Sequence, residues 1–345
     1  MLKKMGLRKI LLTTSALFVI GLLYIFPTKN VKVNRSINYV NEENLLCIYL
    51  LDKNSYVSEV DVVVNESELE KKLIEKLTIM TIDSDMSNKI PKEFKSIIPS
   101  NTKVNSLKIE NDTVTVDFSK DLLGISSILE EKMIEAIVFT LTSEEGLDKV
   151  IIKVDGSVLE RLPNSNKLLP EILDRSFGIN KNYDINNIYG LTKTTIYYIG
   201  NSNDVEYYVP VTKINNSNDE KVNIIVNELK SSILYQSNLS SYLNSKVELQ
   251  KYEKEKEVMN LTFNDKIFDN IYDNNILEEV VYTIGRSVID SYEDVSEVVF
   301  NVNDKEILKS GTFWHKVLEK TKKVLYTLVV LWVGSVAQQD RATAF

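Results

Sequence analysis

The sequence predicts an α+β protein with two tandem βαββαβ-type sandwiches, each with an extra N-terminal hairpin strand, behind an N-terminal transmembrane helix. Three observations support this prediction. A basic leader precedes a fully apolar stretch, and the middle of the chain repeats itself about 148 positions later. Within each copy, apolar residues recur with the period of a strand in some segments and of a helix in others. A length of 345 residues also suits two domains.

The N-terminal stretch predicts a single membrane anchor. Residues 10–26 are 17 consecutive uncharged residues, and at ~1.5 Å per residue such a helix is near the lower limit for crossing a bilayer. Residues 1–9 carry four basic side chains, which places them in the cytoplasm and the bulk of the chain outside the cell membrane. The alternatives are a cleaved signal peptide and a buried core helix. The stretch is long for a signal peptide, and no A-x-A pattern follows it.

Charge is unevenly distributed along the chain. The sequence has 41 basic and 49 acidic residues, a net charge of −8, yet residues 1–35 contain seven basic residues and no acidic one. The remainder is therefore strongly acidic and repels nucleic acid. We expect the membrane to be one partner of the chain and nucleic acid not to be a partner.

The composition excludes several kinds of site. A structural zinc site needs four ligands, and the chain has one Cys and one His, Cys47 and His315. The single Cys also excludes an intrachain disulfide. No glycine-rich nucleotide motif is present. We read Cys47 as a core residue and His315 as a residue of the tail, and we expect no cofactor, no metal and no catalytic residue.

The first copy begins with a predicted hairpin and a helix. Residues 45–51 are apolar and favour a strand, and residues 56–64 follow a short turn. A helix then starts near Ser67, where Ser67-x-x-Glu70 matches a capping box.

A second hairpin, a second helix and a final strand complete this copy. Residues 103–110 and 113–118 flank Asn111-Asp112, which tolerate the backbone of a tight turn. In the next segment, apolar residues stand at helical spacing: Ile134, Ile137, Val138 and Leu141. The last strand is residues 150–156, which end on a turn at Asp155-Gly156. We expect a mixed sheet with two helices on one face.

The second copy repeats this order. Ile196-Tyr197 matches Ile48-Tyr49, and residues 298–304 match residues 150–156, both at an offset of 148. Its predicted elements are a helix at 219–233, a hairpin of 246–253 with 258–263, and a helix with apolar residues at 277, 280, 281 and 284. That last helix matches at an offset of 143, which places five extra residues between the helix and the final strand.

These observations divide the chain into seven parts. They are a leader (1–9), an anchor (10–26), a linker (27–43), a first domain (44–160), a second linker (161–191), a second domain (192–309) and a tail (310–345). We expect the second linker to pack against both domains. The end of the tail resembles a mistranslated bacterial transfer-RNA gene, and we expect the tail to lie outside the fold. The alternative is an interfacial or second membrane segment.

Several segments resemble one family. The segments IYLLDKNSYVSEV, IIPSNTKVNSLKIENDTVTVDFS and AIVFTLTSEEGLDKVIIKVDG in the first copy, with VVYTIGRS and VVFNVND in the second, resemble the GerMN domain of bacterial sporulation and spore-germination proteins. The resemblance covers residues 45–308. It implies a non-enzymatic envelope protein with tandem copies, working with other envelope or sporulation proteins such as those joining the mother-cell and forespore membranes. Members are often lipid-anchored. This sequence has no lipobox Cys, so the transmembrane helix is expected to anchor it.

The tyrosines are the candidate partner-binding residues. The chain has 17 Tyr, and two adjacent pairs fall in the second copy: Tyr197, Tyr198, Tyr207 and Tyr208. Tyr is enriched at interfaces, although it also simply suits strands. Because side chains alternate along a strand, one member of the pair Tyr207-Tyr208 should face the core.

Clustered acids are weaker candidates. Glu66, Glu68 and Glu70 suggest a cation site, but they also suit the start of a helix. Glu144-Glu145 and Glu278-Glu279 are neighbours in sequence, and we read them as surface residues because such neighbours lack the opposed geometry of catalytic carboxylates. The predicted function is an extracytoplasmic scaffold. The alternative is a peptidoglycan-binding accessory or a carboxylate-dependent envelope enzyme.

Overall fold

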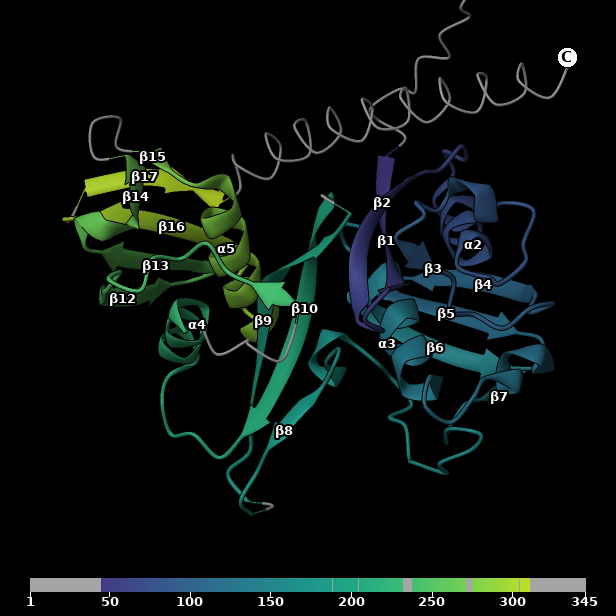
Figure 1. Cartoon of the computed structure of the whole chain (residues 1–345). Coiled ribbons are helices and arrows are strands. Elements are labelled where there is room, and N and C mark those ends of the chain that lie inside the picture. Colours follow the sequence, from purple (N-terminus) through teal and green to yellow (C-terminus); the bar gives the residue numbers. More distant parts are fainter. Residues whose placement is uncertain are drawn as a thin grey trace, which may run out of the picture. The chain divides into compact units, whose positions relative to one another are not determined.

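The structure, a computed structural model, describes residues 45–187, 189–203, 205–231, 238–270, 275–303 and 305–310 (Figure 1). The predicted leader, anchor and first linker, and residues 311–345 of the tail, lie outside the described residues. Within the described ranges, no helix has both the length and the apolar character that crossing a membrane requires.

The first copy, purple to blue in Figure 1, follows the predicted order of strands and helices with short additions. Its elements are β1 (Leu45–Asp52), β2 (Val57–Val63), α2 (Leu69–Ile79), η2 (Ser87–Lys89), β3 (Phe94–Lys95), β4 (Val104–Glu110), β5 (Thr113–Phe118), η3 (Lys120–Gly124), α3 (Glu130–Leu141), β6 (Lys149–Val154) and β7 (Ser157–Val158).

The segment between the copies and the second copy, teal to yellow, complete the described chain. The segment contains η4 (Arg175–Phe177) and β8 (Asn182–Asp184). The second copy contains β9 (Thr192–Ser202), β10 (Val205–Asn215), α4 (Lys221–Lys230), β11 (Leu239–Ser240), β12 (Leu249–Glu255), β13 (Val258–Phe263), η5 (Asp265–Ile267), β14 (Phe268–Asn270), β15 (Asn275–Ile276), α5 (Glu278–Ser291), β16 (Glu297–Val302) and β17 (Lys305–Lys309).

Each copy contains two main sheets, not the single mixed sheet that we predicted. In the first copy, the strand orders are β2-β1-β3 and β4-β5-β6-β7, and in the second they are β11-β9-β10-β8 and β12-β13-β16-β17. The hairpin that opens each copy is antiparallel, whereas β5 with β6, and β13 with β16, are parallel. The predicted sheet is split because helices α3 and α5 contact strands of both sheets in their own copy, so they form a layer between them.

Helical and strand periodicity place the core as expected. The α3 residues at positions 134, 137, 138 and 141 are all fully buried, as are Val114 and Val116 of β5. Their burial confirms the predicted apolar faces, because i, i+3, i+4 and i+7 lie on one side of a helix and alternate residues lie on one side of a strand. Asn111 has a φ of 54°, which suits the predicted turn between β4 and β5.

The predicted capping box at Ser67 is absent. The N-cap of α2 is Glu68, whose side chain makes no capping hydrogen bond. Glu75, one turn and a half into the helix, instead accepts hydrogen bonds from the backbone N–H groups of Asn65 and Glu66, each at 2.9 Å. The chain before α2 is therefore fixed by a carboxylate from within the helix.

Helix α3 closes an open edge of strand β1. The N–H of Tyr49 donates to Oγ1 of Thr140 at 2.9 Å, and the hydroxyl of Ser143 donates to the carbonyl of Cys47 at 3.3 Å. Strand β3 pairs only with the far end of β1. Hydroxyl groups of Thr140 and Ser143 therefore occupy this edge of β1 in place of a neighbouring strand. A strand edge left unpaired would be open to pairing with another chain.

The second copy repeats this closure and corrects the predicted alignment. Ser287 accepts from the N–H of Tyr197 at 2.8 Å, and Ser291 accepts from the N–H of Thr195 at 3.0 Å. Ser287 is therefore equivalent to Thr140 at an offset of 147, and Ser291 is equivalent to Ser143 at an offset of 148. The predicted offset for this helix was 143. The extra residues of the second copy therefore precede α5, in the segment of η5, β14 and β15. The apolar stripe of an amphipathic helix looks the same when it is displaced by one turn. The predicted alignment was displaced by about that amount.

Candidate functional site

The two copies meet through equivalent parts. Strands β2 and β10, which correspond in the repeat, lie against each other. The hydroxyls of Tyr49 and Tyr197, which are separated by 148 residues in the sequence, lie 3.5 Å apart, and both side chains are fully buried. The copies therefore meet at equivalent strands and at a pair of equivalent tyrosines.

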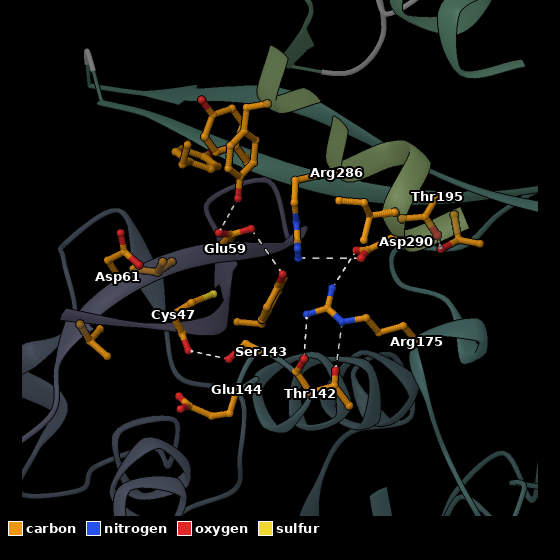
Figure 2. A pocket seen from close by; sticks show the side chains of 18 of the residues that line it. Cys47, Glu59, Asp61, Thr142, Ser143, Glu144, Arg175, Thr195, Arg286 and Asp290 are labelled. Atoms are coloured by element: carbon orange, nitrogen blue, oxygen red, sulfur yellow. Dashed lines mark hydrogen bonds and ion pairs between the residues drawn. The ribbon is translucent and has the colours of Figure 1, made fainter. Parts of the chain in front are cut away.

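An ionic centre lies beside these tyrosines (Figure 2). Asp290 of α5 is 2.7 Å from Nη1 of Arg175 and 3.8 Å from Nη2 of Arg286, and it accepts a hydrogen bond from the hydroxyl of Tyr197. Burial alone would raise the pKa of Asp290, but the two guanidinium groups outweigh it and hold this pKa below its ordinary value. The carboxylate is thus charged in the interior.

Arg175, which lies between the copies in the sequence, connects them. Its Nε donates to Oγ1 of Thr142 at 3.1 Å in the first copy, while its Nη1 pairs with Asp290 in the second. The guanidinium also lies over the ring of Phe139, 4.7 Å from the ring centre. One side chain therefore binds α5 and the end of α3.

One carboxylate from each strand of the first hairpin, β1 and β2, also accepts a hydrogen bond from the second copy. Glu59 of β2 accepts from the hydroxyl of Tyr282 of α5 at 2.7 Å. Asp52, at the end of β1, accepts from the hydroxyl of Tyr207 at 2.9 Å. Hydrogen bonds to ionised acceptors are stronger than neutral ones. Both contacts hold the hairpin of the first copy against the second copy.

Asn180 joins the two hairpins through its amide. Its Oδ1 accepts from the N–H of Val57 at 2.9 Å, and its Nδ2 donates to the carbonyls of Val57 and Pro210 at 2.7 and 2.8 Å. Its own N–H donates to Glu135 at 2.8 Å. These bonds confirm that the segment between the copies packs against both.

The predicted partner-binding tyrosines lie mostly inside the chain. Tyr197, Tyr198 and Tyr207 are 0%, 1% and 7% exposed, and Tyr208 is half-buried. Tyr207 and Tyr208 point to opposite faces of β10, as alternation requires: Tyr207 faces the core and Tyr208 a partly exposed surface. The hydroxyls of Tyr197 and Tyr207 serve contacts between the copies. Direct contact of these tyrosines with another protein stays a prediction, and of the four only Tyr208 has substantial exposure.

A large groove runs between the copies and beside the ionic centre. It has a volume of about 2450 Å³ and takes its walls from β1, β2, β10, α5 and the segments that connect them. Fifteen of its lining residues are Asp or Glu, whereas seven are Lys or Arg. The groove therefore presents negative charge and favours a positively charged ligand.

Two stacked tyrosines form part of one wall of the groove. The rings of Tyr208 and Tyr282 are 3.9 Å apart with an angle of 17° between their planes. Burial raises the pKa of Tyr208, and the carboxylates of Glu279, Glu59, Glu278 and Glu206 raise it further. Four negative groups thus act on one aromatic surface. The hydroxyl of Tyr242 donates to Glu206, a hydrogen bond that raises the pKa of Tyr242 to about 12.

Glu144 is not the simple surface carboxylate that the sequence indicated. It accepts a hydrogen bond from Nζ of Lys76, whose side chain is 1% exposed, and lies 3.5 Å from Nζ of Lys72. Burial raises the pKa of Glu144, but the two lysines lower it by more. The pKa of Glu144 therefore lies below its ordinary value. The sequence could not reveal this role because Lys76 stands on α2, 68 residues from Glu144, and looks like an ordinary exposed lysine.

The other candidates have structural surroundings. Burial raises the pKa of the Cys47 thiol well above its ordinary value, which opposes a nucleophilic thiolate, and Cys47 packs against the core. Among the described residues, no group of three His, Cys, Asp or Glu side chains is arranged to hold a metal ion. Asp155 and Gly156, with φ of 46° and 83°, form the predicted turn. Glu68 pairs with Lys71 on the surface. His315 lies outside the described residues.

Comparison with known proteins identifies relatives. The sequence profile of the family "Germane: Sporulation and spore germination" matches residues 47–160 and 195–308. The spore germination protein GerM of Bacillus subtilis (strain 168) is 30% identical over 270 residues, which are 76% of this chain and 72% of that protein. The solved tandem GerMN domains of the sporulation protein GerM from Bacillus subtilis superpose with a TM-score of 0.68 at 29% identity, covering 76% of this chain and 91% of that one.

Proposed function

Because the chain belongs to the Germane family of sporulation and spore germination, we propose that it is a membrane-anchored, extracytoplasmic scaffold of spore formation or germination. In this role it assembles with other envelope proteins, including those that join the mother-cell and forespore membranes. The basic leader and apolar stretch of the sequence support the anchor. The similarity to GerM supports the process but names no partner.

The observation that carries this proposal is the set of buried polar contacts that join the two copies. Arg175, Asp290, Asn180 and the facing tyrosines Tyr49 and Tyr197 are buried or nearly so and bond to each other or to both copies. Charged groups in the interior are costly unless they are paired, so these residues specify one arrangement of the copies. A fixed arrangement of two domains suits a protein that holds neighbours at a set distance.

The alternative role is a peptidoglycan-binding accessory or a carboxylate-dependent envelope enzyme, and the acidic groove is the feature that favours it. Such an enzyme requires one carboxylate whose loss abolishes activity in a folded protein. A scaffold requires no individual carboxylate for catalysis. Substituting groove carboxylates singly therefore separates the two roles, provided that localisation and stability are measured in parallel.

Topology and capture together test the proposal. The full-length chain, with an affinity tag at its C-terminus, is expressed in sporulating cells in place of the native protein and cross-linked before extraction of membranes. We expect external protease to digest residues 45–310 in intact protoplasts, and we expect capture to recover envelope proteins. Complete protection of residues 45–310 would overturn the topology. Failure to capture any envelope protein, together with loss of sporulation in a folded single-carboxylate variant, would favour the enzyme.

A further inference from the structure

We propose that the acidic groove between the copies binds a lysine- or arginine-rich segment of a partner protein, and that the wall formed by Tyr208, Tyr282, Glu206 and Glu279 holds one of its cationic side chains. This inference rests on the proposed scaffold function and adds to it a surface and a chemistry for the partner. The groove lies between the copies, and the wall that holds the cationic side chain belongs to β10 and α5 of the second copy.

The size of the groove favours a chain segment over a small molecule. Its volume of about 2450 Å³ exceeds the range of roughly 300–1,000 Å³ that suits small ligands. Its walls extend from β1 and β2 in the first copy to β10 and α5 in the second. An extended peptide can follow such a surface and contact both copies at once.

The charge of the groove favours a basic segment. Its acidic lining residues outnumber the basic ones by fifteen to seven. Two of the basic residues, Arg175 and Arg286, are already engaged by the buried Asp290. In contrast, Glu59, Glu206 and Glu279 form no ion pair within the described part of the chain. Bringing a cation to these carboxylates is favourable, and salt weakens the attraction.

The stacked tyrosines give this charge a specific position. A Lys or Arg side chain over the face of a tyrosine is attracted by the ring, and nearby carboxylates add to the attraction. Tyr208 has four carboxylates acting on it, and Glu206 and Glu279 are two of them. Glu206 is exposed and Glu279 half-buried, so both are accessible to a ligand. The aromatic surface and the negative charge are thus in one place.

Peptide binding to the full-length chain in detergent micelles tests the inference. The probe is a fluorescein-labelled twelve-residue peptide of alternating Lys and Gly or Ser, and binding is followed by fluorescence anisotropy at low and moderate salt. We expect saturable binding that weakens with salt, and at least tenfold weaker binding of the same peptide with Glu in place of Lys.

The decisive comparison uses two double variants with the same change in net charge. The groove variant is Glu206→Gln with Glu279→Gln. The control is Glu110→Gln with Glu255→Gln, two exposed residues of β4 and β12 that do not line the groove. We expect the groove variant to bind at least tenfold more weakly and the control to change less than twofold, with equal melting temperatures. Equal weakening in both would show non-specific attraction and overturn the site, as would the absence of saturable binding.

Three further variants test the tyrosine wall and the identity of the occupant. Tyr208→Phe should keep binding, whereas Tyr208→Leu should weaken it several-fold; equal effects would remove the tyrosine wall from the proposal.

The chain's own basic segment is a rival occupant. If the peptide binds only after Lys29, Lys32 and Arg35 are replaced by Gln in the full-length chain, that segment fills the groove and the partner assignment is wrong.

The failure of this inference differs from the failure of the scaffold. If partners are captured from sporulating cells as well by the Glu206→Gln, Glu279→Gln chain as by the unaltered chain, the groove is not the docking surface, although the scaffold role stands. Co-sedimentation with purified peptidoglycan that is lost in this variant, without any peptide binding, would assign the groove to peptidoglycan instead.

Discussion

Asp290 of α5 lies 2.7 Å from the guanidinium of Arg175, which belongs to neither copy but to the segment between them. The part of the segment around Arg175, including the buried Ile179 and Asn180, therefore packs into the interior. The charge of Arg175, together with that of Arg286, keeps the Asp290 carboxylate ionised beside buried tyrosines. The stability of the whole chain and the arrangement of its copies should thus depend on this one pair.

Arg175→Met is expected to lower the free energy of unfolding by about 3–5 kcal/mol, because it leaves the Asp290 carboxylate buried without its nearest positively charged partner. Urea unfolding of the full chain measures the change. Arg161→Met is the control, since Arg161 is exposed and donates only to a loop carbonyl. A loss below 1 kcal/mol for Arg175→Met would contradict a structural role for the pair.

The same pair predicts a pH dependence. The pKa of Asp290 is lower in the folded chain than its ordinary value of about 3.9, so its contribution to stability is complete above that pH and is lost as pH falls through the folded pKa. Asp290→Asn should therefore destabilise the chain at neutral pH, and the difference from the unaltered chain should shrink below about pH 4. Urea unfolding at a series of pH values would reveal a constant difference if this account is wrong.

Glu144→Gln is expected to lower the free energy of unfolding by about 1–3 kcal/mol, because the buried ammonium of Lys76 loses its charged partner. Glu145→Gln, at the neighbouring exposed position, should change stability by less than about 0.5 kcal/mol. Adding Lys76→Met to Glu144→Gln should recover part of the loss. Equal, small effects at both positions would show that the pair is not stabilising.

Asn180→Ala should destabilise the chain by several kcal/mol in urea unfolding, since the backbone groups of Val57 and Pro210 would stay buried without their partners. Part of any loss would come from the positive φ of 46° at Asn180, which alanine disfavours. Asn166→Ala measures this part, because Asn166 has a φ of 55° and is exposed. If the two losses were equal, the amide contacts would contribute nothing.

Tyr207→Phe should cost about 1.5–3 kcal/mol, because it removes the hydrogen bond to the buried carboxylate of Asp52. Tyr208→Phe should cost much less, as the stacked ring against Tyr282 remains. Thermal unfolding of the two variants compares these neighbours directly. A larger loss at Tyr208 than at Tyr207 would contradict the placement of the two hydroxyls.

Local periodicity predicted most of the elements. The strand at β5 and the apolar face of α3 follow from residue spacing alone, because a period of 2 or 3.6 determines which side is buried. The division of each copy into two sheets did not follow, since sequence spacing does not say which strands pair. The alignment of α5 also failed, because an amphipathic stripe looks the same when it is displaced by one turn.

The site was predicted only in part. The paired tyrosines were predicted to bind a partner protein, and that stays a prediction; Tyr197 and Tyr207 contact the first copy of this chain. The role of Arg175 had no signal, because its partners Thr142 and Asp290 are 33 and 115 residues away in sequence. The aromatic and acidic wall had no sequence signal either, since Glu206 and Glu279 are 73 residues apart and Glu59 joins them only when the copies pack.

The contact between Tyr49 and Tyr197 bears on how a two-copy chain arises. Equivalent strands and equivalent tyrosines meet here, which is the kind of contact that an isologous pair of one-copy chains makes. Gene duplication and fusion would then convert an association that depends on concentration into one that does not. Each half is afterwards free to change on its own, as the addition of Arg175 and the asymmetric ion pair with Asp290 illustrate.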